Sequence, residues 1–271
     1  MRVWNNLELD NWDTPVIHGA LEGNSELIPN DMKSNGKKTI LYCAQPKSAS
    51  LYITKLLAKT FKAKEYWIGF NKGSGELYFP RFLGALQDPA LTISHCHSRA
   101  DNKLVTILKK TNPVVIVSYR NLLDTLVSRR DMFIKDGGAA ELLSDSGTRD
   151  FINASPKEQL DIVIELYAQQ YINFYASWKR VAKQFDVFFI KYGSFINNQK
   201  SVLSKLSEHI FNKPLAINAD NIAEDIMNAG GVNFNKGKKG RGNDLFTESQ
   251  KDRIKEIAAI YNLEDSEYLG I

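Results

Sequence analysis

The sequence predicts a single α/β domain in which helices flank a central parallel sheet, and three observations lead to this class. Short apolar runs such as 39–44 and 113–119 have the length and composition of strands covered on both faces. Longer segments carry apolar residues at the three- to four-residue spacing of helices that pack on such a sheet. The 271 residues are 43% hydrophobic and contain no Pro/Ser-rich linker, so one core is expected.

Residues 1–36 show no periodicity and are expected to form an irregular arm on the α/β domain, which takes residues 37–271. The first residues lack the apolar core of a signal peptide, and no run of 18 apolar residues occurs. Cys43 and Cys96 both lie in predicted buried strands, and two cysteines do not make a secreted disulfide framework. These features predict a soluble, cytoplasmic protein.

The first predicted strand, 39–44, leads through the turn 45–50 into a predicted helix over 51–61. A helix N-terminus offers backbone N–H groups and a partial positive charge, and here Lys47 and two serines stand beside it. This predicts an anion cradle. The turn contains no glycine, which argues against the G-x-x-x-x-G-K-[ST] loop of nucleoside triphosphatases.

The next predicted strand, 91–97, brings His95 and His97 to its end, and the polar run after it is expected to cap a helix over 103–110. The aromatic residues between 65 and 82 are expected to belong to the core more than to a cleft. No third ligand has the spacing that zinc would need with the two histidines, so no metal site is predicted. At least one of these histidines is expected to be a packed structural residue.

The clearest buried strand, 113–119, runs into Arg120 and a helix that Asn121 can cap. Arg120 is expected at the carboxyl end of the strand and Ser128 about two helical turns on, at the edge where α/β proteins bind ligands. A guanidinium group there suits phosphate.

The remaining segments follow the same alternation. The segment 136–156 is rich in Gly, Ser and Asp and is expected to be a mobile insertion, a possible lid. A basic, glycine-rich loop over 230–244 precedes a terminal helix opened by Thr247. The net charge of +4 gathers in short clusters, which favours a small polyanionic ligand over nucleic acid. The other predicted elements are an amphipathic helix over 157–183, a strand over 186–192, and helices over 195–211 and 220–227.

Three motifs stand at predicted strand or helix ends: P-K-S-A-S-L-Y at 46–52, R-N-L-L-D-T-L-V-S at 120–128, and the glycine-rich segment 234–247. Together they resemble the P-K-S-G-T-T-W, R-N-x-x-D-x-x-x-S and F-R-K-G-x-x-G-D-W-x-N-x-F-T motifs of sulfotransferases that use 3′-phosphoadenosine 5′-phosphosulfate (PAPS). Their order along the chain is also the family's, and the resemblance spans roughly 38–261. It implies the P-loop-like sulfotransferase fold.

The resemblance implies transfer of a sulfuryl group from PAPS, leaving adenosine 3′,5′-bisphosphate, to a hydroxyl or amine of a small-molecule, carbohydrate or lipid acceptor. Catalysis would rest on Lys47, Ser128 and a histidine base, for which the spacing to Arg120 favours His97 over His95. No nucleic acid and no metal are implied. The residues implied in cofactor binding are Lys47, Ser48, Ala49, Ser50, Leu51, Tyr52, Arg120, Ser128, Tyr192, Lys236, Gly237 and Lys238.

The sequence departs from the family's motifs at several positions. Ala49 and Ser50 replace the loop glycine and the first threonine, and Asn235 replaces an arginine that would grip the 3′-phosphate. Lys236, Lys238 or Arg241 is expected to take over that contact. Two alternatives therefore stay open, a P-loop nucleotide kinase or NTPase and a catalytically silent nucleotide-binding protein.

Overall fold

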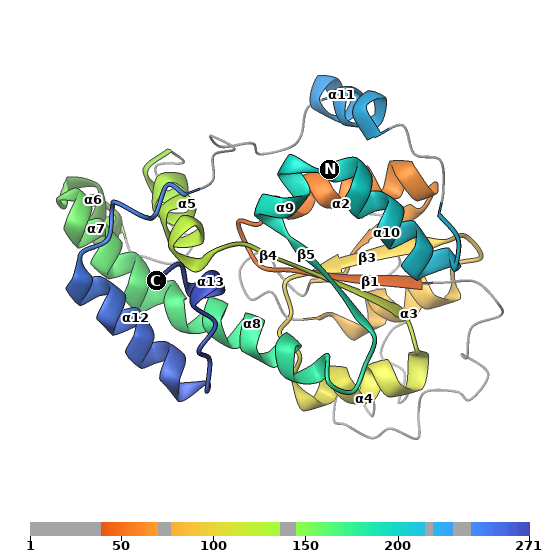
Figure 1. Ribbon diagram of the computed structural model, residues 1–271, viewed down its shortest axis with the longest axis horizontal. Coiled ribbons are helices and arrows are strands. Elements are labelled where there is room, and N and C mark those ends of the chain that lie inside the picture. The colour runs from red at the N-terminus through yellow and green to blue at the C-terminus, as the bar shows by residue number, and fades with distance from the viewer. Residues whose placement is uncertain (1–38, 70–76, 136–144, 215–218, 230–239) are drawn as a thin grey trace.

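The structure, a computed structural model, describes residues 39–69, 77–135, 145–214, 219–229 and 240–271 (Figure 1). The predicted N-terminal arm, 1–36, lies outside the described residues, and so do Lys236, Gly237 and Lys238. No helix of the described part is long and apolar enough to cross a membrane.

A five-stranded parallel sheet forms the centre of the domain, with strand order β2-β3-β1-β4-β5. β1 is central, and all six of its residues are buried, as the apolar run predicted. The predicted α/β class with a parallel sheet is therefore confirmed. The strands are β1 (Thr39–Ala44), β2 (Lys64–Trp67), β3 (Thr92–Cys96), β4 (Val114–Tyr119) and β5 (Val187–Lys191).

Helices cover both faces of the sheet (Figure 1). One face packs on α2 (Ser50–Phe61), α9 (Tyr192–Asn197), α10 (Gln199–Phe211) and α11 (Ala219–Ala229). The other packs on α3 (Phe79–Gln87), α4 (Asn102–Thr111) and α8 (Gln169–Val181). Beyond the end of β4, a third cluster joins α5 (Leu122–Lys135) to α6 (Asp145–Asn153), α7 (Pro156–Val163), α12 (Glu248–Ile260) and α13 (Ser266–Leu269).

Side-chain caps set the helix starts that the sequence predicted. The Asp101 side chain accepts from the Leu104 backbone N–H at the start of α4, and Asn121 Oδ1 accepts from Asp124 N in α5. Thr247 opens α12 through a capping box with Gln250.

Residues 136–144 of the insertion expected over 136–156 lie outside the described residues, and the irregular structure expected for the rest was wrong. Residues 145–153 form α6 instead of an irregular insertion, because Phe151 is buried against Phe133, with ring centroids 5.6 Å apart. A single aromatic anchor among polar residues gives little periodic signal. The helix predicted over 157–183 is interrupted by a π-helical segment, η4 (Ile164–Ala168), which lies between α7 and α8.

Candidate active site

The turn between β1 and α2 presents a helix N-terminus to the carboxyl edge of the sheet. Lys47 and Ala49 both adopt left-handed backbone conformations, with φ of 69° and 62°. Left-handed residues that alternate with others turn backbone N–H groups toward a common point, which is how anion-binding nests form. No side chain of the described residues caps the start of α2 at Ala49. The first N–H groups of α2 are therefore not satisfied by a capping side chain.

Ser48 holds this turn from the inside. Its hydroxyl donates to the Gln45 carbonyl at 2.6 Å and lies 3.0 Å from the Ser118 hydroxyl at the end of β4. Tyr42 lies 2.7 Å from the same Ser118 oxygen, and Gln45 Nε2 donates to Thr125 Oγ1 in α5. Ser48 is fully buried. The Ser48 side chain thus links the turn after β1 to β4, and through Gln45 to α5. The anion cradle is therefore formed by backbone N–H groups of the turn.

Arg120 lies where the motif predicted, between the end of β4 and the start of α5. Its guanidinium carbon is 4.6 Å from the centroid of the Tyr192 ring, and Nη2 is 3.5 Å from Asp124 Oδ2. Both Arg120 and Ser128 are buried. Tyr192 therefore packs against Arg120, and the resemblance implies both residues in cofactor binding.

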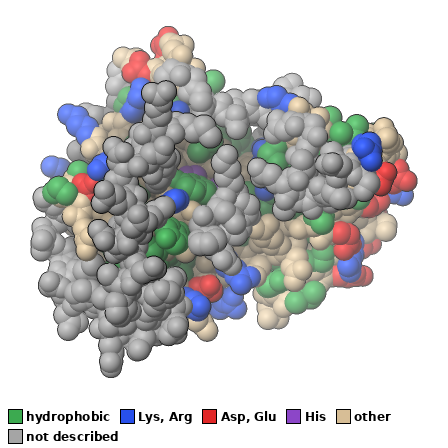
Figure 2. Space-filling view, turned by 180° about the vertical axis from the view of Figure 1, so that it is seen from behind, with side chains coloured by type: hydrophobic (Ala, Val, Ile, Leu, Met, Phe, Trp, Pro, Cys, Tyr) green, Lys and Arg blue, Asp and Glu red, His purple; other side chains and the backbone are tan. Residues whose placement is uncertain are grey.

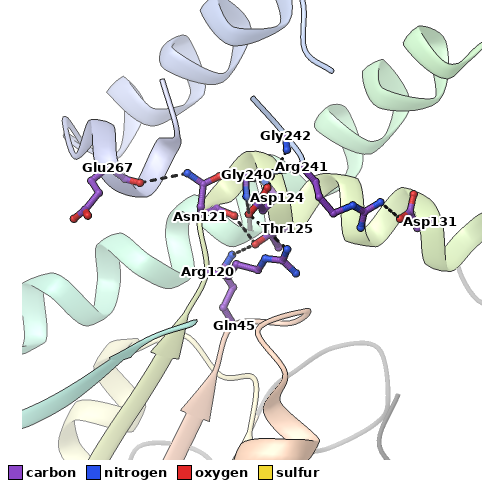
Figure 3. Close-up of polar contacts among 10 residues, drawn as sticks. All are labelled: Gln45, Arg120, Asn121, Asp124, Thr125, Asp131, Gly240, Arg241, Gly242 and Glu267. Atoms are coloured by element: carbon purple, nitrogen blue, oxygen red, sulfur yellow. Dashed lines mark hydrogen bonds and ion pairs between the residues drawn. The ribbon is translucent and has the colours of Figure 1, made fainter. Parts of the chain in front are cut away.

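Asp124 ties a distant segment to this arginine (Figure 3). Its two carboxylate oxygens accept hydrogen bonds from the backbone N–H groups of Gly240 and Gly242, each at 2.9 Å. A Cβ atom at Gly242 would lie 2.5 Å from Leu123 Cβ, so only glycine allows this approach. We call Asp124, Gly240 and Gly242 the loop clamp. It holds the described end of the basic, glycine-rich loop beside α5.

Arg241 lies within this segment, but it makes an ion pair with Asp131, which also pairs with Arg130 at 3.2 Å. The role that the sequence offered to Arg241, replacing the family's 3′-phosphate arginine, therefore competes with a protein carboxylate. The other two candidates for that role, Lys236 and Lys238, lie outside the described residues.

Two further residues of the P-K-S-A-S-L-Y motif lie in the first turn of α2. The Tyr52 hydroxyl donates to Gln199 Oε1 at 2.9 Å, and its ring packs edge-on against Phe195. Leu51 is 44% exposed. Tyr52 thus anchors α2 to α9 and α10, and its assignment to the cofactor remains a prediction.

His97 follows β3 directly, and its ring reaches the turn after β1. Its Nδ1 lies 2.7 Å from the Ala44 carbonyl oxygen. Because a carbonyl can only accept, Nδ1 must carry the proton, which leaves the lone pair of the neutral ring on Nε2. Burial lowers the pKa of His97 to about 4, against the raising effect of the Ala44 carbonyl, and the charge of Arg129 lowers it further. The ring is therefore neutral at pH 7.

His95 occupies a different environment two residues earlier on the same strand. It is 3% exposed, stacks on Tyr42 at 5.2 Å and meets the Trp67 ring edge-on at 5.0 Å. Burial and then the neighbouring His97 hold its pKa well below the usual value. These contacts are those of a packed residue.

The sequence reading missed Arg129, which follows Ser128 in α5. Its Nε donates to the Tyr171 hydroxyl at 2.8 Å, and its guanidinium carbon lies 4.6 Å from the centroid of Tyr167. Trp67, at the end of β2, packs on His97 with centroids 5.5 Å apart. Only the placement of an arginine directly after the motif serine could have drawn attention to Arg129. Among the residues described, no group of three or more His, Cys, Asp or Glu is arranged to hold a metal ion.

Figure 2 shows one face on which a histidine side chain lies recessed among hydrophobic side chains, close to the tip of a basic residue. Burial in apolar surroundings disfavours the charged form of an imidazole. Burial has this effect on both His95 and His97, whose pKa values are lowered.

Solved structures share this architecture. Mouse sulfotransferase SULT7A1 complexed with PAP is 15% identical, with a TM-score of 0.62 over 92% of this chain and 90% of that one. Retinol dehydratase with androsterone and the inactive cofactor PAP is 13% identical, with a TM-score of 0.53 over 84% and 81%. Retinol dehydratase with retinol and PAP is 12% identical, with a TM-score of 0.53 over 93% and 86%. No protein-family model and no curated protein matches the chain. At these identities the likeness concerns the fold, and the chain has the fold of the PAPS-dependent sulfotransferases.

Proposed function

We propose that the protein is a sulfotransferase that moves a sulfuryl group from PAPS to a hydroxyl or amine of an acceptor. The observation that carries this proposal is the hydrogen bond between His97 Nδ1 and the Ala44 carbonyl. It joins a neutral imidazole to the residue just before the turn at the α2 N-terminus. A proton acceptor and an anion cradle therefore stand side by side, which is what transfer of an anionic group to a hydroxyl requires.

The residues would divide the work as follows. Backbone N–H groups at the start of α2 and the Lys47 ammonium group stabilise the negative charge that gathers on the leaving 5′-phosphate. The acceptor's oxygen or nitrogen forms a bond to the sulfur of PAPS while the bond between sulfur and the 5′-phosphate oxygen breaks. His97 Nε2 takes the proton that the acceptor loses in this step. PAPS supplies the sulfuryl group and leaves as PAP, which is adenosine 3′,5′-bisphosphate.

The 3′-phosphate would lie against Arg120 and Ser128, with Lys236, Gly237 and Lys238 completing its site. The loop clamp supports this part of the proposal, because Asp124 binds both Arg120 and the segment that follows those three residues. Ser50 and the backbone of Ser48 and Ala49 would contact the 5′-phosphosulfate, and Tyr192 would line the adenine side. The acceptor is proposed to be a small molecule, carbohydrate or lipid.

A thermal-shift comparison tests the nucleotide site. PAP should raise the melting temperature more than adenosine 5′-monophosphate, and Arg120→Ala should weaken PAP by about 1.5–3 kcal/mol, as expected for charge-assisted hydrogen bonds. Arg253→Ala is the matched control, since Arg253 is an exposed arginine of α12 that pairs with Glu165. Equal shifts by the two nucleotides would reject the 3′-phosphate assignment, and a larger shift by ATP with magnesium would favour a kinase or NTPase.

Turnover separates an enzyme from a silent binding protein. Labelled PAPS should transfer its sulfuryl group to at least one member of a panel of phenols, sugars and lipids. Tight PAP binding with no transfer to any class would support the silent nucleotide-binding alternative.

A further inference from the structure

Arg129 is a partly buried cation whose partners among the described residues are neutral. Its guanidinium group contacts the Tyr171 hydroxyl, the Tyr167 ring and, at 4.0 Å from Nη1, the Met132 sulfur. Tyr167 and Tyr171 are themselves buried. Contacts of this kind fix the direction of a guanidinium plane without neutralising its charge.

The other described arginines of this region differ from Arg129 in one respect. Arg120 lies beside Asp124, while Arg130 and Arg241 share Asp131. Among the described residues, none places a carboxylate within ion-pair distance of Arg129. A partly buried charge with no counter-ion among the described residues is less well stabilised than a paired one, so an arrangement of this kind points to an anion supplied from outside the chain.

The position of Arg129 indicates which ligand would supply that anion. Helix α8, whose Tyr171 binds Arg129, also binds the residue after His97, because Trp178 Nε1 donates to the Ser98 carbonyl at 3.0 Å. The charge of Arg129 accordingly lowers the pKa of His97, the residue proposed to accept the acceptor's proton. Trp67 packs on the same histidine and is only partly buried. The side chains around Tyr167 belong to the π-helical segment, and single π-turns are frequent at functional sites. Arg129 is therefore associated with the residue at which the acceptor must react, whereas Arg120 belongs to the nucleotide side.

We propose that Arg129 binds an anionic group of the acceptor, so that the preferred acceptors carry a carboxylate, sulfate or phosphate in addition to the hydroxyl or amine that reacts. This inference rests on the proposed sulfuryl transfer. The guanidinium plane held by Tyr167 and Tyr171 offers two parallel N–H donors to such a group. Arg129 is thus a specificity-determining residue.

Matched probe pairs test this in the PAP-loaded protein. Phenyl β-glucuronide is compared with phenyl β-glucoside, and 4-hydroxybenzoate with 4-hydroxybenzamide, by calorimetry. The carboxylate member of at least one pair should bind about tenfold or more tightly, and Arg129→Gln should abolish that preference while PAP affinity stays unchanged. Arg129→Lys should keep part of it. Arg130→Gln is the control, because the charge of Arg130 already has a protein counter-ion in Asp131.

Three results would overturn the proposal: no preference in either pair, a preference that survives Arg129→Gln, or a loss of PAP affinity in that variant, which would assign the cation to the donor. If Arg129→Gln does not fold, Tyr171→Phe removes only the hydroxyl that orients Nε, and the preference should then fall several-fold.

A second readout is the pKa of His97 by NMR, which should rise in Arg129→Gln and not in Arg130→Gln. An unchanged pKa of His97 in Arg129→Gln would refute the placement of Arg129. Should PAP fail to bind, the sulfotransferase proposal falls, whereas a carboxylate preference measured without PAP and lost in Arg129→Gln would still support the anion site.

Discussion

The loop clamp and the surroundings of His97 lie at the same edge of the sheet, yet they treat charge in opposite ways. At the loop clamp, Asp124 accepts hydrogen bonds from two backbone N–H groups and lies beside the guanidinium group of Arg120. The charges of Asp124 and Arg120 therefore neutralise each other. Around His97, aromatic rings hold a neutral imidazole and a guanidinium group apart from carboxylates of the described chain. The charged groups of the loop clamp are paired with each other without a ligand, and they hold two segments of the chain together. The guanidinium group near His97 has a charge that, in our proposal, an anionic group of the acceptor would pair with.

The largest effect is expected where this difference bears on chemistry. His97→Ala should lower turnover by about 10²–10⁴, because it removes the proton acceptor, while PAP affinity and melting temperature change little. His95→Ala is the matched variant on the same strand face and should mainly lower stability, since it empties a packed site between Tyr42 and Trp67. Rates, PAP affinities and melting temperatures of both variants decide the matter. If His95→Ala alone abolished transfer in a stable protein, the two roles would be exchanged.

Acid should destabilise the fold through the same two histidines. Both have a lower pKa in the folded chain than in the unfolded one, so the unfolded chain binds protons more readily. Stability is therefore full above about pH 6.5 and is lost as the pH falls toward 4, by up to about 3 kcal/mol for His97 alone. Chemical unfolding at several pH values measures this loss. His97→Ala should flatten the dependence, and a slope identical to that of the wild type would contradict the lowered pKa.

The loop clamp can be broken at its closest approach. Gly242→Ala would push a methyl group against Leu123, costing about 1–3 kcal/mol, and should weaken PAP because the basic loop is no longer held beside α5. Gly84→Ala is the matched control, as a Cβ there has no heavy atom within 4 Å and alanine favours the helix. Unfolding and PAP titration distinguish the two. Wild-type PAP affinity in a folded Gly242→Ala protein would show that the clamp does not serve the nucleotide site.

The smallest effect is expected at the turn that begins α2. Ala49 carries a side chain in a left-handed conformation, where glycine is free of strain, so Ala49→Gly should change stability by less than about 1 kcal/mol and can increase it. Ala58→Gly, inside the same helix, should cost about 1 kcal/mol or more. Equal losses in both variants would mean that Ala49 is not strained.

Local patterns were enough to predict most of the sheet and the helix caps, because an apolar run or a capping serine, threonine or aspartate acts on its immediate neighbours. Thr247 and Asp101 are examples. The inward direction of Ser48 was not predictable, since it depends on Ser118, 70 residues away. The link from Asp124 to Gly242 spans 118 residues, and the electrostatic effect of Arg129 on His97 likewise depends on how separate elements assemble. The sequence identified these groups as candidates, but only the folded structure shows which of them lie close together.

The π-helical segment has a consequence for chain length. A π-turn carries one residue more than an α-turn, so η4 shifts the phase between the buried face of α7, with Leu160 and Val163, and that of α8, with Tyr171. Deleting one residue within 164–168 would remove the extra residue and leave a regular α-helix, with α8 in the same rotation relative to α7. Deleting one residue elsewhere between Leu160 and Tyr171, with the π-turn kept, would rotate the rest of α8 by about 100° relative to α7. Tyr171 would then turn away from Arg129, even though every remaining side chain was unchanged.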